Sequence, residues 1–237
     1  MIVMAASVLL ALSLAMPVAF GQVGTGATSS GTSQKLVTAW WQWALANHLA
    51  DNPLFGGDPN YSAEQCDGSP LPDTVDDQWF MAGTLDGAKV VRTCNMPAGK
   101  PLFFPAFNTV VIAEDGDTEA SLLAQAHDFM KAVQDSRGFN MVVKVDGKVV
   151  PNKTIVRAEA PLFGGESLLL SDLGFGDGTA PYSYQAVADG RWVTLPGFSE
   201  GKHTIRWEIS APNADTDPTT AGAEGFFQNN TYRLTVR

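Results

Sequence analysis

The pattern of hydrophobic and polar positions changes along the chain from a helical period to a strand-like one. Residues 34–50 place apolar side chains three and four positions apart, which predicts an amphipathic helix capped by Thr32 or Ser33. Residues 51–77 are rich in Gly, Pro, Asp and Asn and predict a long acidic loop. From residue 78 onward, short runs with alternating apolar residues predict strands.

Three Asp-Gly pairs separate strand-like runs, at residues 86–87, 146–147 and 189–190. Asp-Gly adopts at low cost the positive φ that both central residues of a type I′ turn need, so each pair predicts a β-hairpin. Residues 171–181 and 211–230 are polar and predict long loops.

A second helix is predicted inside the β region, capped by Asp117 or Thr118 and ended by Gly138. Its apolar stripe consists of Leu122, Ala126, Phe129 and Val133. The whole pattern predicts a mainly β fold, an antiparallel β-sandwich or jelly-roll-like domain with two packed α-helices.

The first 21 residues have the pattern of a signal peptide. An apolar run covers residues 8–18, and Ala19 and Gly21 precede the predicted cleavage before Gln22. No Lys or Arg precedes the run, so an uncleaved anchor or a buried helix stays an alternative. Residues 22–33 then predict a flexible lead-in, and residues 34–237 a single β-rich domain without a membrane span. The predicted location is secreted or periplasmic.

The formal net charge of −10 limits the partners of the mature protein. Nucleic acids and anionic membrane surfaces both require basic patches, so neither is an expected partner. The acidity is compatible with cation binding, and equally with an exported protein that is simply soluble.

Cys66 and Cys94 are the two cysteines of the chain, and in an exported protein they predict one disulfide bond. Closing a loop of about 28 residues stabilises a fold by roughly 3–4 kcal/mol in the chain-entropy model. A catalytic or metal-binding thiol pair is disfavoured, because the chain contains no Cys-x-x-Cys sequence.

Catalytic candidates are weak. No Gly-x-Ser-x-Gly sequence marks a nucleophile, although a triad assembled from distant residues stays open. The remaining acid–base candidates are His48, Glu114, Glu159 and Glu166, with Glu159 and Glu166 on either side of a predicted turn.

A calcium site is one interpretation of Glu114, Asp115 and Asp117, because hard oxygen ligands cluster in this way. The favoured alternative is that these acids cap the second helix and complement its dipole. The three histidines lie at no local ligand spacing, so no metal is predicted from them.

Trp40, Trp41 and Trp43 place three indoles within four helical positions, so the rings cannot all face one direction. Core packing with one interfacial ring is one interpretation; the other is that Trp41 or Trp43 offers a platform for sugar stacking or partner binding. Arg92, and Asn108 in an otherwise apolar run, are further ligand-binding candidates, since a buried amide must find a hydrogen-bond partner in the backbone or in a ligand.

Several short motifs occur along the chain: Trp40 to Trp43, Asn52-Pro53, Arg92-x-Cys94, Pro97-x-Gly99-Lys100-x-Leu102-Phe103-Phe104-Pro105, Asp189-Gly190-Arg191-Trp192 and Gly201-Lys202-His203-Thr204-Ile205. Together they resemble the motifs of a family of uncharacterised exported bacterial proteins. Pro101 directly follows Lys100, where the family pattern leads us to expect a less restrictive residue. The resemblance implies a fold and an exported location, and no activity.

Two functions of different classes remain. The leading hypothesis is a non-catalytic binding or surface-associated module, with a saccharide or another envelope component as its partner. The alternative is a secreted hydrolase or lyase that acts on a polysaccharide or a small polar substrate through acidic residues.

Overall fold

The computed structural model describes residues 31–55, 78–85, 87, 89–177, 181–215 and 225–237. The predicted signal peptide, Cys66 and most of the predicted acidic loop lie outside these residues. None of the described helices combines the length and the apolar character needed to span a membrane.

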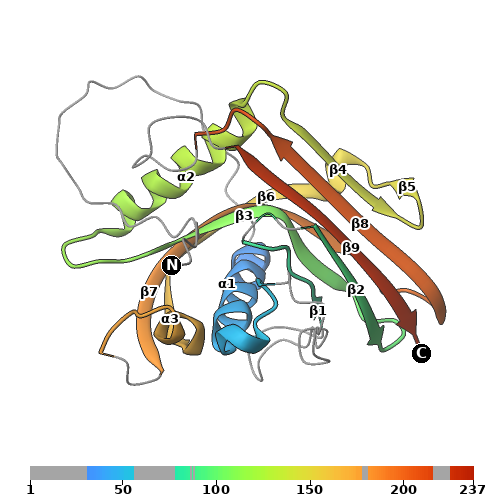
Figure 1. The fold of residues 1–237 in the computed structure, drawn as a ribbon, viewed down its shortest axis with the longest axis horizontal. Coiled ribbons are helices and arrows are strands. Elements are labelled where there is room, and N and C mark those ends of the chain that lie inside the picture. The colour runs from blue at the N-terminus through green and yellow to red at the C-terminus, as the bar shows by residue number, and fades with distance from the viewer. Residues whose placement is uncertain (1–30, 56–77, 86, 88, 178–180, 216–224) are drawn as a thin grey trace, which may run out of the picture.

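Two β-sheets packed face to face confirm the predicted mainly β sandwich (Figure 1). The four-stranded sheet has the order β1-β3-β7-β6, and the five-stranded sheet has the order β2-β9-β8-β4-β5. Most pairs are antiparallel, but β1 pairs with β3, and β2 with β9, in parallel, so the sheets are mixed. The strands are β1 (Trp79–Phe80), β2 (Lys89–Met96), β3 (Leu102–Ile112), β4 (Asn140–Val145), β5 (Lys148–Val149), β6 (Ile155–Ser167), β7 (Tyr182–Leu195), β8 (Gly201–Ala211) and β9 (Phe226–Val236).

The described residues include three α-helices, one more than predicted: α1 (Gly31–Ala46), α2 (Glu119–Asp135) and the short α3 (Leu168–Asp172). They also include the 3-10 turns η1 (Leu49–Asp51) and η3 (Asn152–Thr154). The first helix begins at Gly31 and ends at Ala46, so residues 31–33 of the predicted lead-in are helical. Thr118 caps α2 as predicted, in a reciprocal capping box with Ser121.

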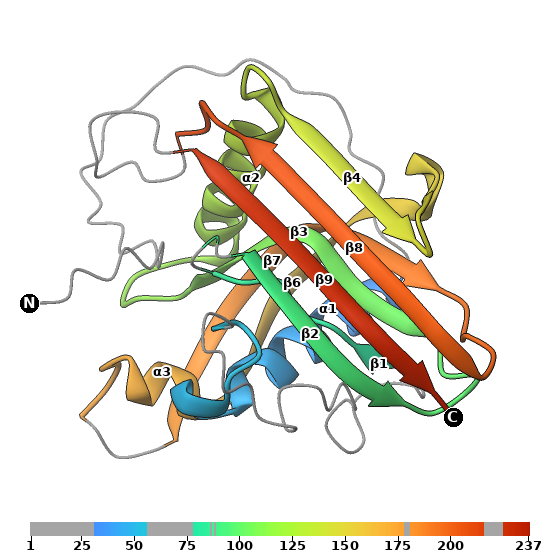
Figure 2. The same ribbon diagram turned by 45° about the vertical axis from the view of Figure 1, so that its right-hand side comes forward.

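The four-stranded sheet is covered on both faces. One face packs against the five-stranded sheet and α2, and the other packs against α1 and α3 (Figures 1 and 2). The five-stranded sheet shows the strict alternation of a half-exposed sheet, because every second residue of β2 is buried. The predicted inward face of β8 is confirmed by the buried side chains of Ile205, Trp207 and Ile209.

One of the three predicted hairpins is confirmed. Asp146 and Gly147 both have positive φ, 49° and 77°, and join β4 to β5. The prediction at residues 86–87 is wrong, because β1 and β2 belong to different sheets.

The hairpin predicted at residues 189–190 is also wrong, because both residues lie inside β7 and pair with β3 and β6 on either side. A Cβ atom on Gly190 would lie 2.7 Å from both Asn108 Cβ and Trp192 Nε1. This glycine therefore permits close packing across the strand and does not form a turn.

The turn predicted between Glu159 and Glu166 is wrong as well. Both residues belong to β6, which runs alongside β7 with an irregularity after Ala160. The predicted loop at residues 211–230 includes the start of β9 at Phe226.

Candidate functional site

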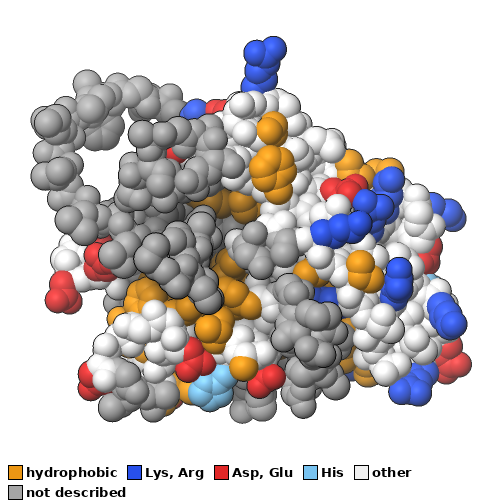
Figure 3. All heavy atoms as spheres, in the orientation of Figure 1, with side chains coloured by type: hydrophobic (Ala, Val, Ile, Leu, Met, Phe, Trp, Pro, Cys, Tyr) orange, Lys and Arg blue, Asp and Glu red, His pale blue; other side chains and the backbone are white. Residues whose placement is uncertain are grey.

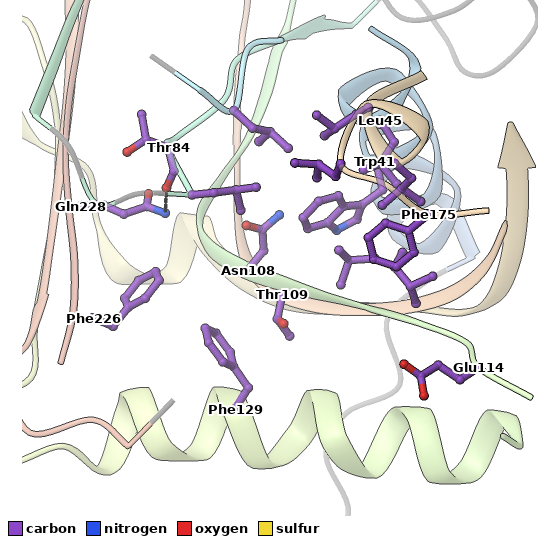
Figure 4. Close-up of a pocket in the computed structure, with 17 residues that line it drawn as sticks. Trp41, Leu45, Thr84, Asn108, Thr109, Glu114, Phe129, Phe175, Phe226 and Gln228 are labelled. Atoms are coloured by element: carbon purple, nitrogen blue, oxygen red, sulfur yellow. Dashed lines mark hydrogen bonds between the residues drawn. The ribbon is translucent and has the colours of Figure 1, made fainter. Parts of the chain in front are cut away.

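A groove lies at the side of β3, among the described residues. It encloses about 110 Å³ and lies between α1 and α3 on one side and α2 and β9 on the other (Figure 4). Figure 3 shows hydrophobic side chains at the surface where Figure 1 places α1, α3 and β3 together. The lining residues are Trp41, Leu45, Leu54, Thr84, Leu85, Asn108, Thr109, Val110, Ile112, Glu114, Phe129, Leu169, Leu170, Leu173, Phe175, Phe226 and Gln228.

Two buried N–H groups in this groove have no hydrogen-bond partner among the described residues. They are Nε1 of Trp41, whose side chain is 1% exposed, and Nδ2 of Asn108. Figure 4 shows the indole and the amide facing the same space. A buried donor without an acceptor costs about 1–3 kcal/mol, so two donors in one apolar groove favour a ligand that carries an acceptor oxygen.

The side-chain amide of Gln228, another polar group of the groove, has partners within the protein. Gln228 Nε2 donates to the carbonyl of Thr84 at 3.2 Å, and Gln228 Oε1 accepts from Asn230 Nδ2 at 3.2 Å. These two bonds hold the amide of Gln228 in place, whereas Trp41 Nε1 and Asn108 Nδ2 have no partner among the described residues.

Three of the candidates from the sequence line the groove, and most of the other lining residues were missed. Trp41 and Asn108 were ligand-binding candidates, and Glu114, a catalytic and calcium candidate, lies at one end of the groove. The apolar wall formed by Leu169, Leu170 and Phe175 was missed. Its signal was the apolar run at residues 168–170, which α3 turns toward α1.

The predicted exposed indole is wrong. Trp40, Trp41 and Trp43 are all buried, since α1 packs its tryptophans against the four-stranded sheet. Trp40 Nε1 donates to the Met81 carbonyl at 3.0 Å, and Trp43 packs edge-on against Phe80. No face of these rings is open for a sugar to stack on.

Arg92 is buried between the sheets, where it binds backbone carbonyls. Its guanidinium donates to the carbonyls of Pro53, at 2.6 Å, and Ala82, at 2.5 Å, and to the hydroxyl of Tyr232. Asn52 caps the end of α1 by donating to the Ala44 carbonyl at 2.8 Å. The Asn-Pro and Arg-x-Cys motifs therefore meet in one network that fixes the segment after α1 to the sandwich.

The acidic candidates Glu114, Asp115 and Asp117 are exposed and lie in the turn before α2. Asp117 accepts hydrogen bonds from the Glu114 backbone N–H at 3.0 Å and from Ser121 Oγ at 3.3 Å. The N-cap of α2 is Thr118, and neither bond of Asp117 comes from a backbone N–H of the helix, so the calcium and helix-cap interpretations both stay predictions.

A second polar cluster joins α2 to the four-stranded sheet. His127 Nε2 lies 3.1 Å from Glu159 and 4.0 Å from the buried Asp189, and one ligand atom from each residue lies within 4.8 Å of the others. Arg157 donates to both carboxylate oxygens of Asp189, which raises the pKa of the guanidinium. Because Arg157 already supplies the positive charge, this cluster is better suited to holding α2 on the sheet than to binding a metal.

The remaining catalytic candidates lie on other elements. His48 Nδ1 lies 3.0 Å from Asp172 at the end of α3, and Asp172 also accepts from the Leu49 backbone N–H, which lowers the pKa of that carboxyl. Glu166 lies near the end of β6. No contact among His48, Glu114, Glu159 and Glu166 occurs in the described part of the chain.

Cys94 is buried in β2, with its side chain on the inner face of the five-stranded sheet. Since Cys66 lies outside the described residues, the disulfide stays a prediction.

Comparisons with known proteins add little to this geometry. No family model and no curated protein matches the chain. Among solved structures, the solution structure of amebosin has 9% sequence identity and a TM-score of 0.19. A cysteine protease inhibitor from Entamoeba histolytica has 10% identity and a TM-score of 0.20. Each match covers 67% of this chain and 96% of the other, and at these scores neither supports an argument about fold or function.

Proposed function

We propose that this chain is a non-catalytic binding protein that takes the apolar part of a ligand into the groove beside β3. The observation that carries the proposal is the pair of unpaired donors, Trp41 Nε1 and Asn108 Nδ2, in a groove with mostly apolar walls. Ligand sites in proteins share this design of hydrophobic walls with a few polar groups that orient the ligand.

The size of the groove indicates what enters it. The enclosed 110 Å³ is similar to the roughly 150 Å³ of an engineered apolar cavity that binds benzene. One ring or a short branched chain therefore fits, with a carbonyl or similar acceptor directed at Trp41 and Asn108.

The test is a titration of the ¹⁵N-labelled protein with acetophenone, which combines a ring and a carbonyl, and with toluene, which lacks the acceptor. We expect acetophenone to shift the indole N–H signal of Trp41 and the side-chain amide signals of Asn108 in a saturable manner. Trp41→Phe identifies the indole signal. Toluene is expected to bind more weakly, and no saturable shift with either compound would contradict the proposal.

A matched pair of variants checks the location. Phe175 lines the groove and is partly buried, whereas Phe227 is 47% exposed and does not line it. Phe175→Ala removes an aromatic wall worth about 1 kcal/mol, so affinity is expected to fall about fivefold. Phe227→Ala is expected to leave affinity unchanged.

Export belongs to the same proposal. The apolar run at residues 8–18 and the two cysteines support a secreted or periplasmic protein with a Cys66–Cys94 disulfide, as in the exported family that the motifs resemble. Thiol titration of the unfolded mature protein tests the bond. Two reactive thiols without reductant would contradict it.

The hydrolase or lyase remains the alternative prediction, with turnover abolished by Glu114→Gln, Glu159→Gln or Glu166→Gln as its test. The structure offers it less support, because its candidate residues make no contact with one another in the described part of the chain. A saccharide ligand lacks the open indole face on which that hypothesis depended.

A further inference from the structure

The groove runs along an edge of β3 that none of the described strands covers. The Ala113 backbone N–H donates to the Gln185 carbonyl at 2.8 Å, and the register pairs Ile112 with Ala186. Hydrogen bonding alternates along an antiparallel pair, so the N–H and C=O groups of Asn108, Val110 and Ile112 point away from β7.

On that side of the sheet, β1 pairs only with Leu102 and Phe103. The backbone groups of Asn108, Val110 and Ile112 are therefore left without a described strand partner. An edge of this kind is a template for another strand, which would continue the line of β1.

Apolar walls flank this edge on both faces of the sheet. Val110 and Ile112 pack on the α1 side, where Trp41, Leu170 and Phe175 form one wall. Phe129 and Phe226 form the other wall, on the α2 side (Figure 4). Side chains of a strand alternate between faces, so an added strand would place successive side chains against the two walls in turn.

Charge marks one end of the edge. Glu114 closes the groove after β3, and the exposed Asp115 and Asp117 follow in the same turn. A basic side chain at the matching end of the ligand would complement the negative charge of this turn.

We propose that the ligand is an extended peptide segment of another protein, with β-branched side chains on both faces and a basic residue near Glu114, which adds as a strand to the edge of β3 that no described strand covers. This inference rests on the proposed binding function of the same groove. It gives a partner to the backbone groups of Asn108, Val110 and Ile112, which no described strand pairs with and which a small apolar molecule would leave unpaired. Strand addition gives affinity through the main chain and specificity through the side chains.

The probe is the acetylated and amidated peptide KVTVTV, whose lysine is meant for the end at Glu114. Its controls are two versions of the same peptide, each N-methylated at alternate residues. Each version blocks the N–H groups along one of the two hydrogen-bonding edges of the peptide. We expect KVTVTV to bind saturably and to slow amide hydrogen exchange at Val110 and Ile112. The N-methylated version that blocks the paired edge is expected to bind at least tenfold more weakly.

Two variants test the backbone pairing at Val110 and the charge at Glu114. Val110→Pro removes an N–H that donates to no described strand, so the fold should persist while peptide affinity falls at least tenfold. Glu114→Gln is expected to weaken KVTVTV two- to fivefold at low salt, whereas Glu200→Gln, at an exposed turn before β8, is expected to have no effect.

The outcomes separate this inference from the proposed function. Binding of acetophenone without binding of KVTVTV would overturn the peptide inference and leave the proposed function standing. Peptide binding that is unaffected by both N-methylations would also overturn it. A dimer without peptide that protects Val110 and Ile112 from exchange would assign the edge to a second copy of this chain and overturn it as well. Failure of both acetophenone and peptide to bind would remove both proposals.

Discussion

Replacing Asn108 by Leu is expected to stabilise the protein while it weakens ligand binding. Nδ2 of Asn108 is buried and has no partner among the described residues, and such a donor costs about 1–3 kcal/mol. Leucine has the same branched shape without the amide. Since the whole Asn108 side chain is only partly buried, we expect the low end of the range, a gain of about 1 kcal/mol in the free energy of unfolding.

The assay is urea denaturation followed by tryptophan fluorescence, together with a thermal melt. A gain of about 1 kcal/mol raises the melting temperature by about 2–4 °C for a domain of this size. The matched control is Asn52→Leu. Asn52 donates to the Ala44 carbonyl and accepts from the Leu54 N–H, so this variant should lose about 1–3 kcal/mol for each buried group left unpaired.

Wild type and Asn108→Leu are then titrated with acetophenone and with toluene. Asn108→Leu is expected to reduce the preference for acetophenone over toluene, because one of the two donors is gone. Destabilisation of Asn108→Leu by more than about 1 kcal/mol would refute the reasoning, since the amide would then serve the fold.

Three further predictions concern the framework around the groove. Gly190→Ala is expected to cost about 1–3 kcal/mol in urea denaturation, since its Cβ would lie 2.7 Å from Asn108 Cβ, and an unchanged midpoint would contradict the close packing. His203 and Asp146 form a hydrogen-bonded pair. The bond with Asp146 raises the pKa of His203, although burial acts to lower it. Burial acts to raise the pKa of Asp146, but hydrogen bonds from His203 and the Thr204 N–H lower it overall. The difference in unfolding free energy between wild type and His203→Gln should therefore be largest between pH 3.8 and 6.5, the ordinary pKa values of the two groups, and should shrink as pH falls below 3.8 or rises above 6.5. A difference that does not change with pH would contradict the pair. Arg157→Met is expected to destabilise the fold by about 3–5 kcal/mol, less any relief from solvent at the partly exposed guanidinium, because it leaves Asp189 buried without its partner; a melting temperature equal to that of wild type would speak against this.

The sequence predicted those parts of the fold that local patterns determine. The period of the helix stripes and the alternation in β8 are properties of neighbouring residues, and both were confirmed. The hairpin at Asp146-Gly147 was confirmed for the same reason, since its two positive φ angles are a local requirement.

The wrong predictions share a different cause. Asp189-Gly190 has the composition of a turn, yet Asp189 is held by Arg157 from β6 and Gly190 by the close approach of Asn108 from β3. These partners lie far away in the sequence, so tertiary contacts override the local preference. The exposed indole failed for a related reason, because the sequence does not show that α1 is covered by both the sheet and α3.

The groove could be predicted only in fragments. Asn108 was identified because an amide in an apolar run must have a partner, and Trp41 because of its unusual neighbours. Their meeting depends on the packing of α1 beside β3, and the walls from α3 and β9 depend on chain segments more than 120 residues away from Trp41. No local pattern encodes such a juxtaposition.

Intermolecular nuclear Overhauser effects between bound acetophenone and the labelled protein test the central claim most directly. We predict contacts from the methyl and ring protons of acetophenone to Trp41, Ile112 and Phe129, which come from the two walls and the edge strand of one groove. Contacts to any other surface, with none to these three residues, would contradict the assignment of the groove as the binding site.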